Sequence, residues 1–310
     1  MKEQLYTFTV QTPVRRIDIL LVEYFEEVSG VFSRNSIQDL IKSGNVLVDD
    51  KTVKPSKVLH GGEKIQIKIP EAQPVDIKAQ NIPIRIVYED DYIIVINKSA
   101  DMVVHPAPGN YEGTLVNAVF YHCKGKLSTI GGETRSGVVH RLDKETSGLI
   151  VMAKDNAAHL DLARQFSDKS ARRQYTAVIW GVPERECDRW ETFYGRHNTD
   201  RKKYTSKLLD GKRAVTNYCI VKENGEESIL NVVLETGRTH QIRVHMQDHG
   251  YSIIGDPVYG KRKQKPVSIK RQALHARSLT IMHPVFKQRM TFFCPLEDDI
   301  KKLIKELGLC

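Results

Sequence analysis

The sequence has few cysteines and no long apolar run. Its five cysteines among 310 residues are scattered, odd in number and never spaced as a CxxC pair. This arrangement argues against a disulfide framework and against a zinc knuckle, and it favours a reducing, cytoplasmic setting. The longest apolar runs, such as "YIIVI" and "LIVMA", are far shorter than the roughly 20 residues that span a bilayer. The first residues contain no apolar core of a secretion signal, so we expect neither export nor membrane insertion.

Motifs for common cofactors are missing as well. The chain contains no P-loop, no GxGxxG fingerprint and no GxSxG around Ser147, so no binding element for a nucleotide cofactor is evident. "HMQDH" places His245 and His249 one helical turn apart, but Met246 stands where a zinc protease has its glutamate. We expect neither cofactor nor metal, and the lack of clustered ligands weakens the interpretation as a metal-dependent nuclease.

Positive charge exceeds negative charge. Lys and Arg total 47 against 38 Asp and Glu, a net charge of +9, which favours a polyanionic partner. An aromatic content of 7% and a hydrophobic content of 40% are ordinary for a folded chain, so the charge is no sign of disorder. At 310 residues the chain exceeds the ~100–200 residues of an ordinary domain, and we start from two domains.

The first 70 residues predict a small α+β unit. We expect an amphipathic helix over 15–27 and a second helix that Ser33 caps and Gly44 ends. Two short strands around an Asp-Asp turn follow in "NVLVDDKTV", and "GGEKIQIKIP" alternates isoleucines with polar residues as a strand does. The second helix carries Arg34 and Lys42 away from its apolar side, where they can meet phosphates or act simply as surface cations.

The remainder of the chain is rich in strand patterns. Residues 71–80 lack both helical period and strand alternation, and we interpret them as a linker. Strand-like segments then recur at 84–89, 92–98, 149–154, 175–180, 229–235, 278–282 and 290–293. Helical patterns occur at 114–123, 156–166, 240–250 and 298–310. Many strands with few helices between them favour an α+β fold, with a mixed, largely antiparallel sheet flanked by helices.

One stretch, "GVVHRLDKETSGLIVMAKD" at 137–155, holds a candidate for chemistry. Its Asp143 lies beside Arg141 and Lys144. Neighbouring cations stabilise a carboxylate, so this aspartate would be ionised at neutral pH and able to act as a nucleophile or a base. The pattern equally fits an aspartate that caps a turn and pairs with Arg141 for structural reasons, and this stretch alone leaves both interpretations open.

This stretch closely resembles the catalytic motif H-R-L-D-x-x-T-S-G-L of the RluA-type pseudouridine synthases. Further motifs of that family follow in family order over about residues 81–296, among them "NKSADMVVHP", "GKRAVTNY", "LETGRTHQIRVHMQDHGYSIIGDPVYG" and "RQALHARSLTIMHP". "SRNSIQDLIKSGNVLVDD" resembles part of an S4 domain, a small RNA-binding module. The resemblance implies an S4-like domain over 13–70, the linker over 71–80 and a pseudouridine synthase catalytic domain over 81–310.

The resemblance also implies roles for single residues. Asp143 falls on the catalytic aspartate of the family, Tyr175 on the tyrosine that lies against the target base, and Arg243 on the arginine that pairs with the catalytic carboxylate. Arg141 resembles the arginine that helps to displace and replace the flipped nucleotide. One departure concerns "NKSADMVVHP", because Asp101 stands where the family usually has a glycine and an expected turn is therefore less rigid.

The implied reaction isomerises uridine in RNA to pseudouridine without a cofactor. Asp143 can attack C1′ of the nucleotide or take a proton from C2′, and residue identity does not separate these paths. The uridine must first leave its stack, at a cost of about a few kcal/mol that phosphate contacts must supply. Cations in two loops are candidates for these contacts, although they also fit ordinary solvated loops: Arg201, Lys202, Lys203, Lys261, Arg262 and Lys263.

The expected substrate follows from the pairing of the two domains. An S4-like module joined to this catalytic domain resembles the family members that act on large-subunit (23S) ribosomal RNA, with transfer RNA as the alternative. A non-catalytic RNA-binding protein that keeps the fold, such as a ribosome assembly factor, is a competing class. The charge fits both classes and the intact Asp143 favours the enzyme. We expect a cytoplasmic monomer whose partner is RNA, with no nucleotide cofactor and no membrane.

Overall fold

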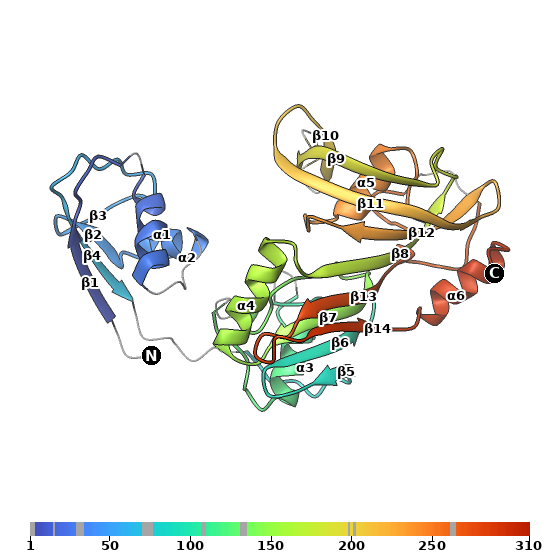
Figure 1. Ribbon diagram of the computed structural model, residues 1–310, viewed down its shortest axis with the longest axis horizontal. Coiled ribbons are helices and arrows are strands. Elements are labelled where there is room, and N and C mark those ends of the chain that lie inside the picture. Colours follow the sequence, from blue (N-terminus) through green and yellow to red (C-terminus); the bar gives the residue numbers. More distant parts are fainter. Residues whose placement is uncertain are drawn as a thin grey trace. The chain divides into compact units, whose positions relative to one another are not determined.

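The computed structural model describes residues 4–14, 16–28, 34–69, 77–106, 110–130, 135–197, 199–200, 203–260 and 265–310. The chain divides into two units, Met1–Asp76 and Ile77–Cys310, each with a hydrophobic core of its own (Figure 1). None of the helices in the described ranges is both long and apolar enough to cross a membrane.

The first unit consists of a four-stranded antiparallel sheet and two helices. Ile65 and Ile67, which alternate with polar residues, share one core with Leu21 and Ile37 from the helices. This confirms the two helices and the strands predicted here, whereas Ser33, the predicted cap of the second helix, lies outside the described residues. The strand order is β1-β4-β2-β3. The elements are β1 (Gln4–Thr9), α1 (Ile17–Val28), α2 (Arg34–Lys42), β2 (Val46–Val48), β3 (Lys51–Thr52) and β4 (Lys64–Ile69).

Two details of this unit differ from or extend the prediction. The strand β1 was not predicted, and it pairs along the whole of β4, from Gln4 opposite Ile69 to Thr9 opposite Lys64. The Asp-Asp turn between β2 and β3 is formed with φ values of 48° and 61° at its two residues. Tight hairpins favour this left-handed conformation, which aspartate tolerates better than most residues.

The second unit is built on one ten-stranded mixed sheet. Its order is β10-β9-β11-β12-β8-β13-β7-β6-β5, with β14 paired to β13, and only β13 and β7 run parallel among the paired strands described. This confirms the mixed, largely antiparallel sheet. Its strands are β5 (Arg85–Glu89), β6 (Ile93–Lys98), β7 (Ser147–Ala153), β8 (Arg172–Trp180), β9 (Cys187–Arg196), β10 (Tyr204–Leu208), β11 (Lys212–Glu223), β12 (Glu227–Leu234), β13 (Leu274–Met282) and β14 (Arg289–Phe293).

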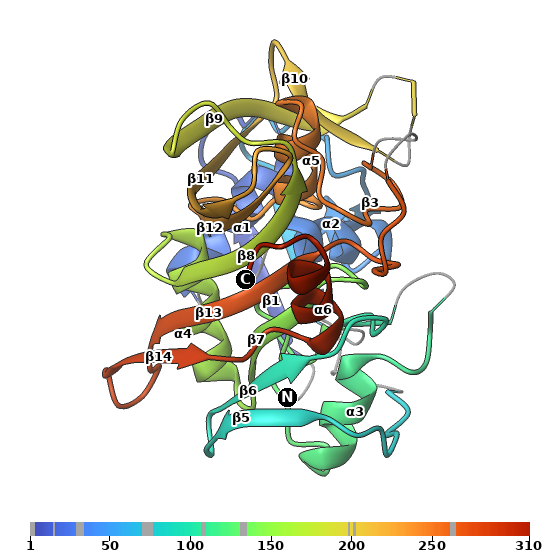
Figure 2. The same ribbon diagram turned by 90° about the vertical axis from the view of Figure 1, so that its right-hand side faces the viewer.

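Helices flank this sheet, as Figure 2 shows, and all four were predicted. Ala158 and Leu162 of α4 share a core with Val95 of β6 and Val151 of β7. The helix α5 packs on the other half of the sheet, where Val244 meets tyrosines of β9 and of the loop after the helix. The helices are α3 (Leu115–His122), α4 (Asn156–Ser167), α5 (Gln241–Asp248) and α6 (Asp298–Glu306).

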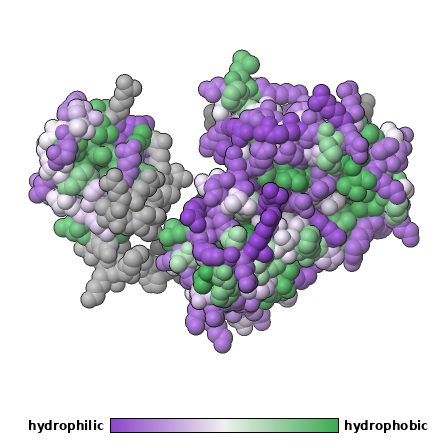
Figure 3. Space-filling model, viewed as in Figure 1, coloured by the Kyte–Doolittle hydropathy of each residue, from purple (hydrophilic) through white to green (hydrophobic). Residues whose placement is uncertain are grey.

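The sequence did not predict β9, β10 and β11, and the structure corrects one expectation about the cysteines there. About half of the side chains of β9 and β11 are exposed, many of them charged, and Figure 3 shows a mainly hydrophilic surface over this part of the sheet. Cys187 and Cys219 lie opposite each other on β9 and β11 and form a disulfide. Because the pair is created by strand register across 32 residues, cysteine spacing could not reveal it.

Candidate active site

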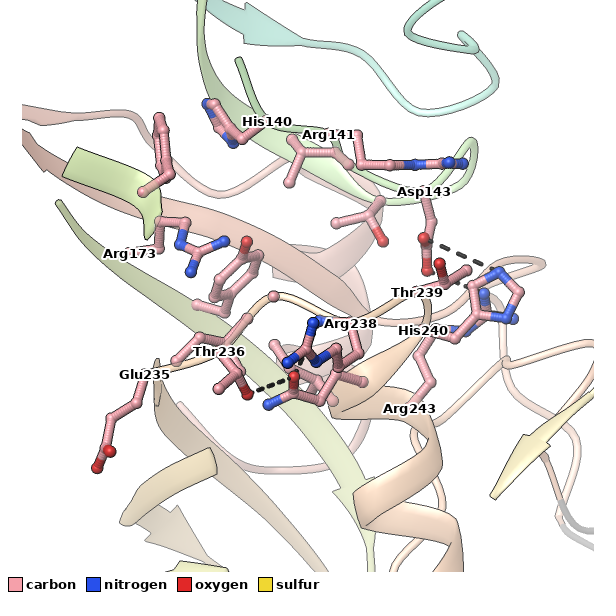
Figure 4. A pocket seen from close by; sticks show the side chains of 18 of the residues that line it. His140, Arg141, Asp143, Arg173, Glu235, Thr236, Arg238, Thr239, His240 and Arg243 are labelled. Carbon is pink, nitrogen blue, oxygen red and sulfur yellow. Dashed lines mark hydrogen bonds and ion pairs between the residues drawn. The ribbon is translucent and has the colours of Figure 1, made fainter. Parts of the chain in front are cut away.

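A cavity of about 430 Å³ opens in the second unit where three chain segments meet (Figure 4). The first is the loop that leads into β7 and carries Asp143, and the second is β8 with Tyr175. The third is the loop between β12 and α5 together with the first turn of that helix, which carries Arg243. Segments that are far apart in sequence thus bring together the residues that the resemblance singled out.

Asp143 lies at the cavity wall with one carboxylate oxygen engaged. Its Oδ2 accepts a hydrogen bond from Nη1 of Arg243 at 3.0 Å, and its side chain is 16% exposed. Its Oδ1 lies 3.9 Å from Nε2 of His240 and accepts no hydrogen bond from the residues that the structure describes. One oxygen of this carboxylate is therefore available to a ligand in the cavity.

A buried ion pair holds Arg243 behind this carboxylate. Nε and Nη2 of Arg243 donate to the two oxygens of Asp256 at 2.7 and 3.0 Å. The backbone N–H groups of Val258 and Tyr259 also donate to Asp256, each at 2.9 Å. Burial opposes the ionised form, but these hydrogen bonds keep the pKa of Asp256 below its ordinary value. Arg243 is thus a fixed cation between two carboxylates.

Tyr175 and His240 complete the surroundings of Asp143 as neutral groups. Burial raises the pKa of Tyr175, so it remains a phenol at neutral pH. His240 begins α5 with a φ of 59°, and its Nδ1 lies 3.1 Å from Oη of Tyr259. Burial lowers the pKa of His240 in spite of the nearby Asp143, so its ring is also uncharged at neutral pH. Of the three residues nearest Asp143, Arg243 is therefore the charged one.

The loop after Asp143 is anchored from below by a buried lysine. Nζ of Lys98, at the end of β6, donates to the carbonyls of Ser99, Met102 and Lys144 at 2.8, 2.9 and 3.0 Å. Burial lowers the pKa of Lys98 to about 7, and the charge of Asp143 opposes this shift. Three carbonyl acceptors need three N–H donors, so we assign the ammonium form to Lys98. It fixes the residue that follows Asp143.

A second anchor comes from the end of the chain. Arg271 forms a bidentate pair with Asp299 of α6, at 2.6 and 2.7 Å, and its Nη1 donates to the carbonyl of Glu145 at 3.1 Å.

The turn that follows Lys98 contains Asp101 with a φ of 65°. Asp101 adopts the left-handed conformation in which the family's glycine would be unstrained, so the turn is formed despite the substitution.

The remaining predicted site residues make no contact with Asp143 in the described part of the chain, and only some of them lie near the cavity. Arg141 lines the cavity as an exposed side chain, whereas Lys203 does not line it. Lys42 lies on α2 of the first unit, exposed and 3.6 Å from Asp39. Several predicted RNA contacts lie outside the described residues, namely the side chain of Arg34 and all of Arg201, Lys202, Lys261, Arg262 and Lys263.

Sequence reasoning missed four contributors to the site: Arg173, His240, Asp256 and Lys98. For Arg173 a signal existed, because it precedes Tyr175 by two residues on a strand and must share its face. The other three reach the site through contacts that only the fold creates. Within the described ranges, no group of three or more His, Cys, Asp or Glu side chains is placed to hold a metal ion.

A mixed sheet with an aspartate and its arginine in a cleft, preceded by a small S4-like unit, defines the class of pseudouridine synthases. The chain belongs to the RNA pseudouridylate synthase family, whose sequence model matches residues 92–248, and the S4 domain model matches residues 15–65. The predicted family, fold class and activity are confirmed, and the chain is an RNA pseudouridine synthase.

Relatives support this assignment over most of the chain. A protein of Zymomonas mobilis subsp. mobilis named ribosomal large subunit pseudouridine synthase D is 43% identical, with 89% of each chain covered. An uncharacterized RNA pseudouridine synthase of Bacillus subtilis, YlyB, is 40% identical, covering 92% of this chain and 93% of its own. The solved structure of human RNA pseudouridylate synthase domain containing 4 shares the fold, with a TM-score of 0.56 over 72% of this chain and 93% of its own at 21% identity.

Proposed function

We propose that this enzyme isomerises specific uridines of large-subunit ribosomal RNA, with Asp143 as the group that acts on the ribose. The observation that carries the proposal is the geometry of Asp143: Arg243 holds one oxygen at 3.0 Å, while the other borders the cavity. The hydrogen bond from Arg243 fixes the carboxylate in place, with an oxygen free for attack or proton removal. The names of relatives, including the protein of Zymomonas mobilis, support ribosomal RNA as the substrate.

The reaction can be followed atom by atom. A carboxylate oxygen of Asp143 bonds to C1′, or removes a proton from C2′, while the N1–C1′ bond breaks and leaves its electron pair on the uracil. The detached base turns within the cavity, and its C5 bonds to C1′ as the link to Asp143 opens or the C2′ proton returns. The C5 proton is then lost and N1 gains a proton. No electron or group donor is consumed.

Three neighbours of Asp143 receive roles in this proposal. Tyr175 lies against the base, so it limits escape of the detached uracil and is a candidate for proton transfer. Arg243 orients Asp143 through the hydrogen bond to its Oδ2. Arg141, exposed at the cavity, contacts the RNA strand from which the uridine has been flipped.

RNA binding extends to both units in this proposal. The S4-like domain at 13–70 contacts phosphates through Arg34 and Lys42, the linker at 71–80 follows, and the catalytic domain occupies 81–310. Within the catalytic domain the loops with Arg201, Lys202, Lys203, Lys261 and Arg262 supply further phosphate contacts. The net charge of +9 supports this division, because phosphate contacts dominate the affinity of RNA-binding proteins.

The test is release of tritium from RNA that carries the label at C5 of uridine. Purified protein is incubated with a large-subunit rRNA transcript, with isolated large subunits and with tRNA transcripts. We expect the wild type to release tritium from a ribosomal substrate, and Asp143→Asn to lose at least about 10⁴-fold in rate because the nucleophile or base is gone. The exposed Asp91, which forms no hydrogen bond or close ion pair with the described residues, offers the control Asp91→Asn with unchanged rate.

The arms of this experiment separate the alternatives. Release from tRNA alone would replace ribosomal RNA by transfer RNA as the substrate. Release by Asp143→Asn at the wild-type rate would contradict the role of Asp143. Binding of RNA without release from any of the three substrates would support a non-catalytic assembly factor.

A further inference from the structure

Arg173 is a buried cation in the cavity that has no carboxylate or carbonyl partner among the described residues. Its residue is 9% exposed, it lines the cavity, and its Nε is enclosed without a hydrogen-bond acceptor. Among the residues that the structure describes, no carboxylate or carbonyl pairs with its guanidinium, which lies 5.4 Å from the ring of Phe166. A buried donor left without an acceptor costs about 1–3 kcal/mol. The cavity therefore carries a donor that a bound molecule would satisfy.

The other cations of the cavity are committed or exposed. The Arg and Lys side chains that line it are Arg141, Lys169, Arg173, Arg238 and Arg243. Arg243 is engaged by its two carboxylates, and Arg238 donates its Nε to a backbone carbonyl at 3.1 Å. Arg141 and Lys169 are exposed, as expected for contacts with the RNA backbone. Arg173 alone in this set is both buried and unengaged.

Arg173 lies on the wall of the cavity opposite Asp143. Figure 4 shows the two side chains entering from opposite walls, with the Arg173 guanidinium pointing into the space between them. Both charges lie close enough to affect Tyr175, whose pKa is raised by burial: Arg173 lowers this pKa and Asp143 raises it. If the ribose C1′ lies at Asp143, the uracil ring extends toward Arg173.

The proposed reaction indicates which ligand Arg173 would bind. When the N1–C1′ bond breaks, its electron pair remains on the base, and the negative charge is shared by N1, O2 and O4. Donors aimed at atoms that gain charge are worth more in the transition state than in the ground state. We propose that Arg173 donates hydrogen bonds to a uracil carbonyl oxygen and stabilises the detached uracil anion, an inference that rests on the proposed function of this same cavity.

Gly237 provides room for this guanidinium. A Cβ built on Gly237 would lie 2.6 Å from Nη1 of Arg173, so any side chain there would displace the donor. Phe166 covers the guanidinium from another side and itself stacks on His140, with ring centroids 4.4 Å apart. Within the part of the chain that the structure describes, the guanidinium is thus held by packing, with no carboxylate to neutralise its charge.

The experiment measures single-turnover tritium release at saturating enzyme, together with the dissociation constant for the same RNA. Arg173→Met should lower the saturating rate by about 10²–10³-fold while leaving the dissociation constant within about threefold. Arg173→Lys, which keeps the charge and loses the forked geometry, should give an intermediate rate. Gly237→Ala should lower the rate in the same direction because it displaces Nη1.

The matched control is Arg172→Met, on the same strand and exposed, with its side chain on the opposite face of the sheet. Its rate should equal that of the wild type. A saturating rate for Arg173→Met within about threefold of the wild type would overturn the inference and leave the proposed function intact. A wild type that releases no tritium would remove both. If Arg173→Met does not fold, Arg173→Lys and Gly237→Ala carry the test.

A backbone phosphate is the competing ligand for this cation. A target RNA with a neutral methylphosphonate on the 5′ side of the uridine distinguishes the two. If Arg173 binds the uracil, the methylphosphonate weakens binding relative to unmodified RNA by the same factor for the wild type and for Arg173→Met. A loss of affinity that appears with the wild type and disappears with Arg173→Met would identify a phosphate contact and overturn the assignment to the base.

Discussion

Arg243 contacts two carboxylates that differ in exposure and therefore have different roles in the site. The Asp256 side chain is fully buried and has Arg243 and two backbone N–H groups as donors, whereas the Asp143 side chain is 16% exposed and borders the cavity. A buried charge must be paired and hydrogen-bonded to be tolerated, and Asp256 meets this condition without any ligand. Asp256 is consequently a positioning residue that fixes the guanidinium on which Asp143 depends.

This arrangement makes a prediction for Asp256→Asn. The amide keeps the shape of the side chain but offers one acceptor in place of two, so Arg243 is free to shift toward Asp143. A displacement of about 1 Å can cost about 10²-fold in rate, and we expect a loss of this size in single-turnover tritium release with little change in RNA affinity. Asp91→Asn serves again as the control. An unchanged rate with folded Asp256→Asn protein would show that Asp256 does not orient the site.

At the level of elements, β7 links the site loop to the centre of the sheet. Gly148 of β7 has a φ of 112°, and a Cβ there would lie 2.3 Å from the carbonyl oxygen of Ala276 on the parallel neighbour β13. No side chain fits between these two backbones. The close approach places β7, and with it the loop that carries Asp143, at a fixed distance from β13.

Gly148→Ala should therefore destabilise the catalytic unit by about 3 kcal/mol or more, because the clash with the backbone adds to the strain of a positive φ. Gly225→Ala is the matched control, since Gly225 has a φ of 90° and open space around its Cβ position. It should lose only about 1 kcal/mol. Urea unfolding measures both, and equal losses for the two variants would contradict the role assigned to the strand contact.

The hydrophobic pattern predicted most elements of the catalytic unit and failed for β9, β10 and β11 at one end of the sheet. The isoleucines of β4 and β6 and the apolar sides of α3 and α4 are visible in the sequence because one face or both faces are buried. In β9 and β11 about half of the side chains are exposed, and apolar residues such as Phe193 and Val221 are among the exposed ones, so the hydrophobic pattern does not identify these strands.

The site residues also divide into those that the sequence predicted and those that it did not. Asp143, Tyr175 and Arg243 were found through the resemblance, which lies in contiguous motifs. Asp256 and Lys98 act through contacts that are created by tertiary structure, and no local pattern distinguishes either residue from an ordinary surface charge. Their roles stem from burial, which spacing along one sequence does not report.

For the molecule as a whole, buried histidines determine the response to acid. His245 and His275 are fully buried, and burial lowers the pKa of each to about 4, from 6.5 in an exposed ring. The unfolded chain binds protons on both between pH 6.5 and about 4, while the folded protein does not. The stability contributed by the neutral rings is complete above pH 6.5 and is lost as the pH falls toward 4.

We therefore expect the free energy of unfolding to fall between about pH 7.5 and 5, by about 2 kcal/mol for each of these histidines. Both tryptophans, Trp180 and Trp190, lie in the catalytic unit, so fluorescence-detected urea unfolding reports this unit. His275→Gln should be less sensitive to acid than the wild type, whereas the exposed His197→Gln should retain the wild-type dependence. A wild-type stability that is flat over this range would contradict the assignment.

The anchor of the site loop by α6 has a consequence for biosynthesis. Asp299 comes long after Glu145 in the sequence, and it pairs with Arg271, which holds the carbonyl of Glu145. During synthesis the amino-terminal parts of a chain fold first, so the S4-like unit can form while the catalytic loop still lacks this partner. The nascent chain completes this anchor of its catalytic loop only after Asp299 has been synthesised, so the site matures later than the fold of the S4-like unit.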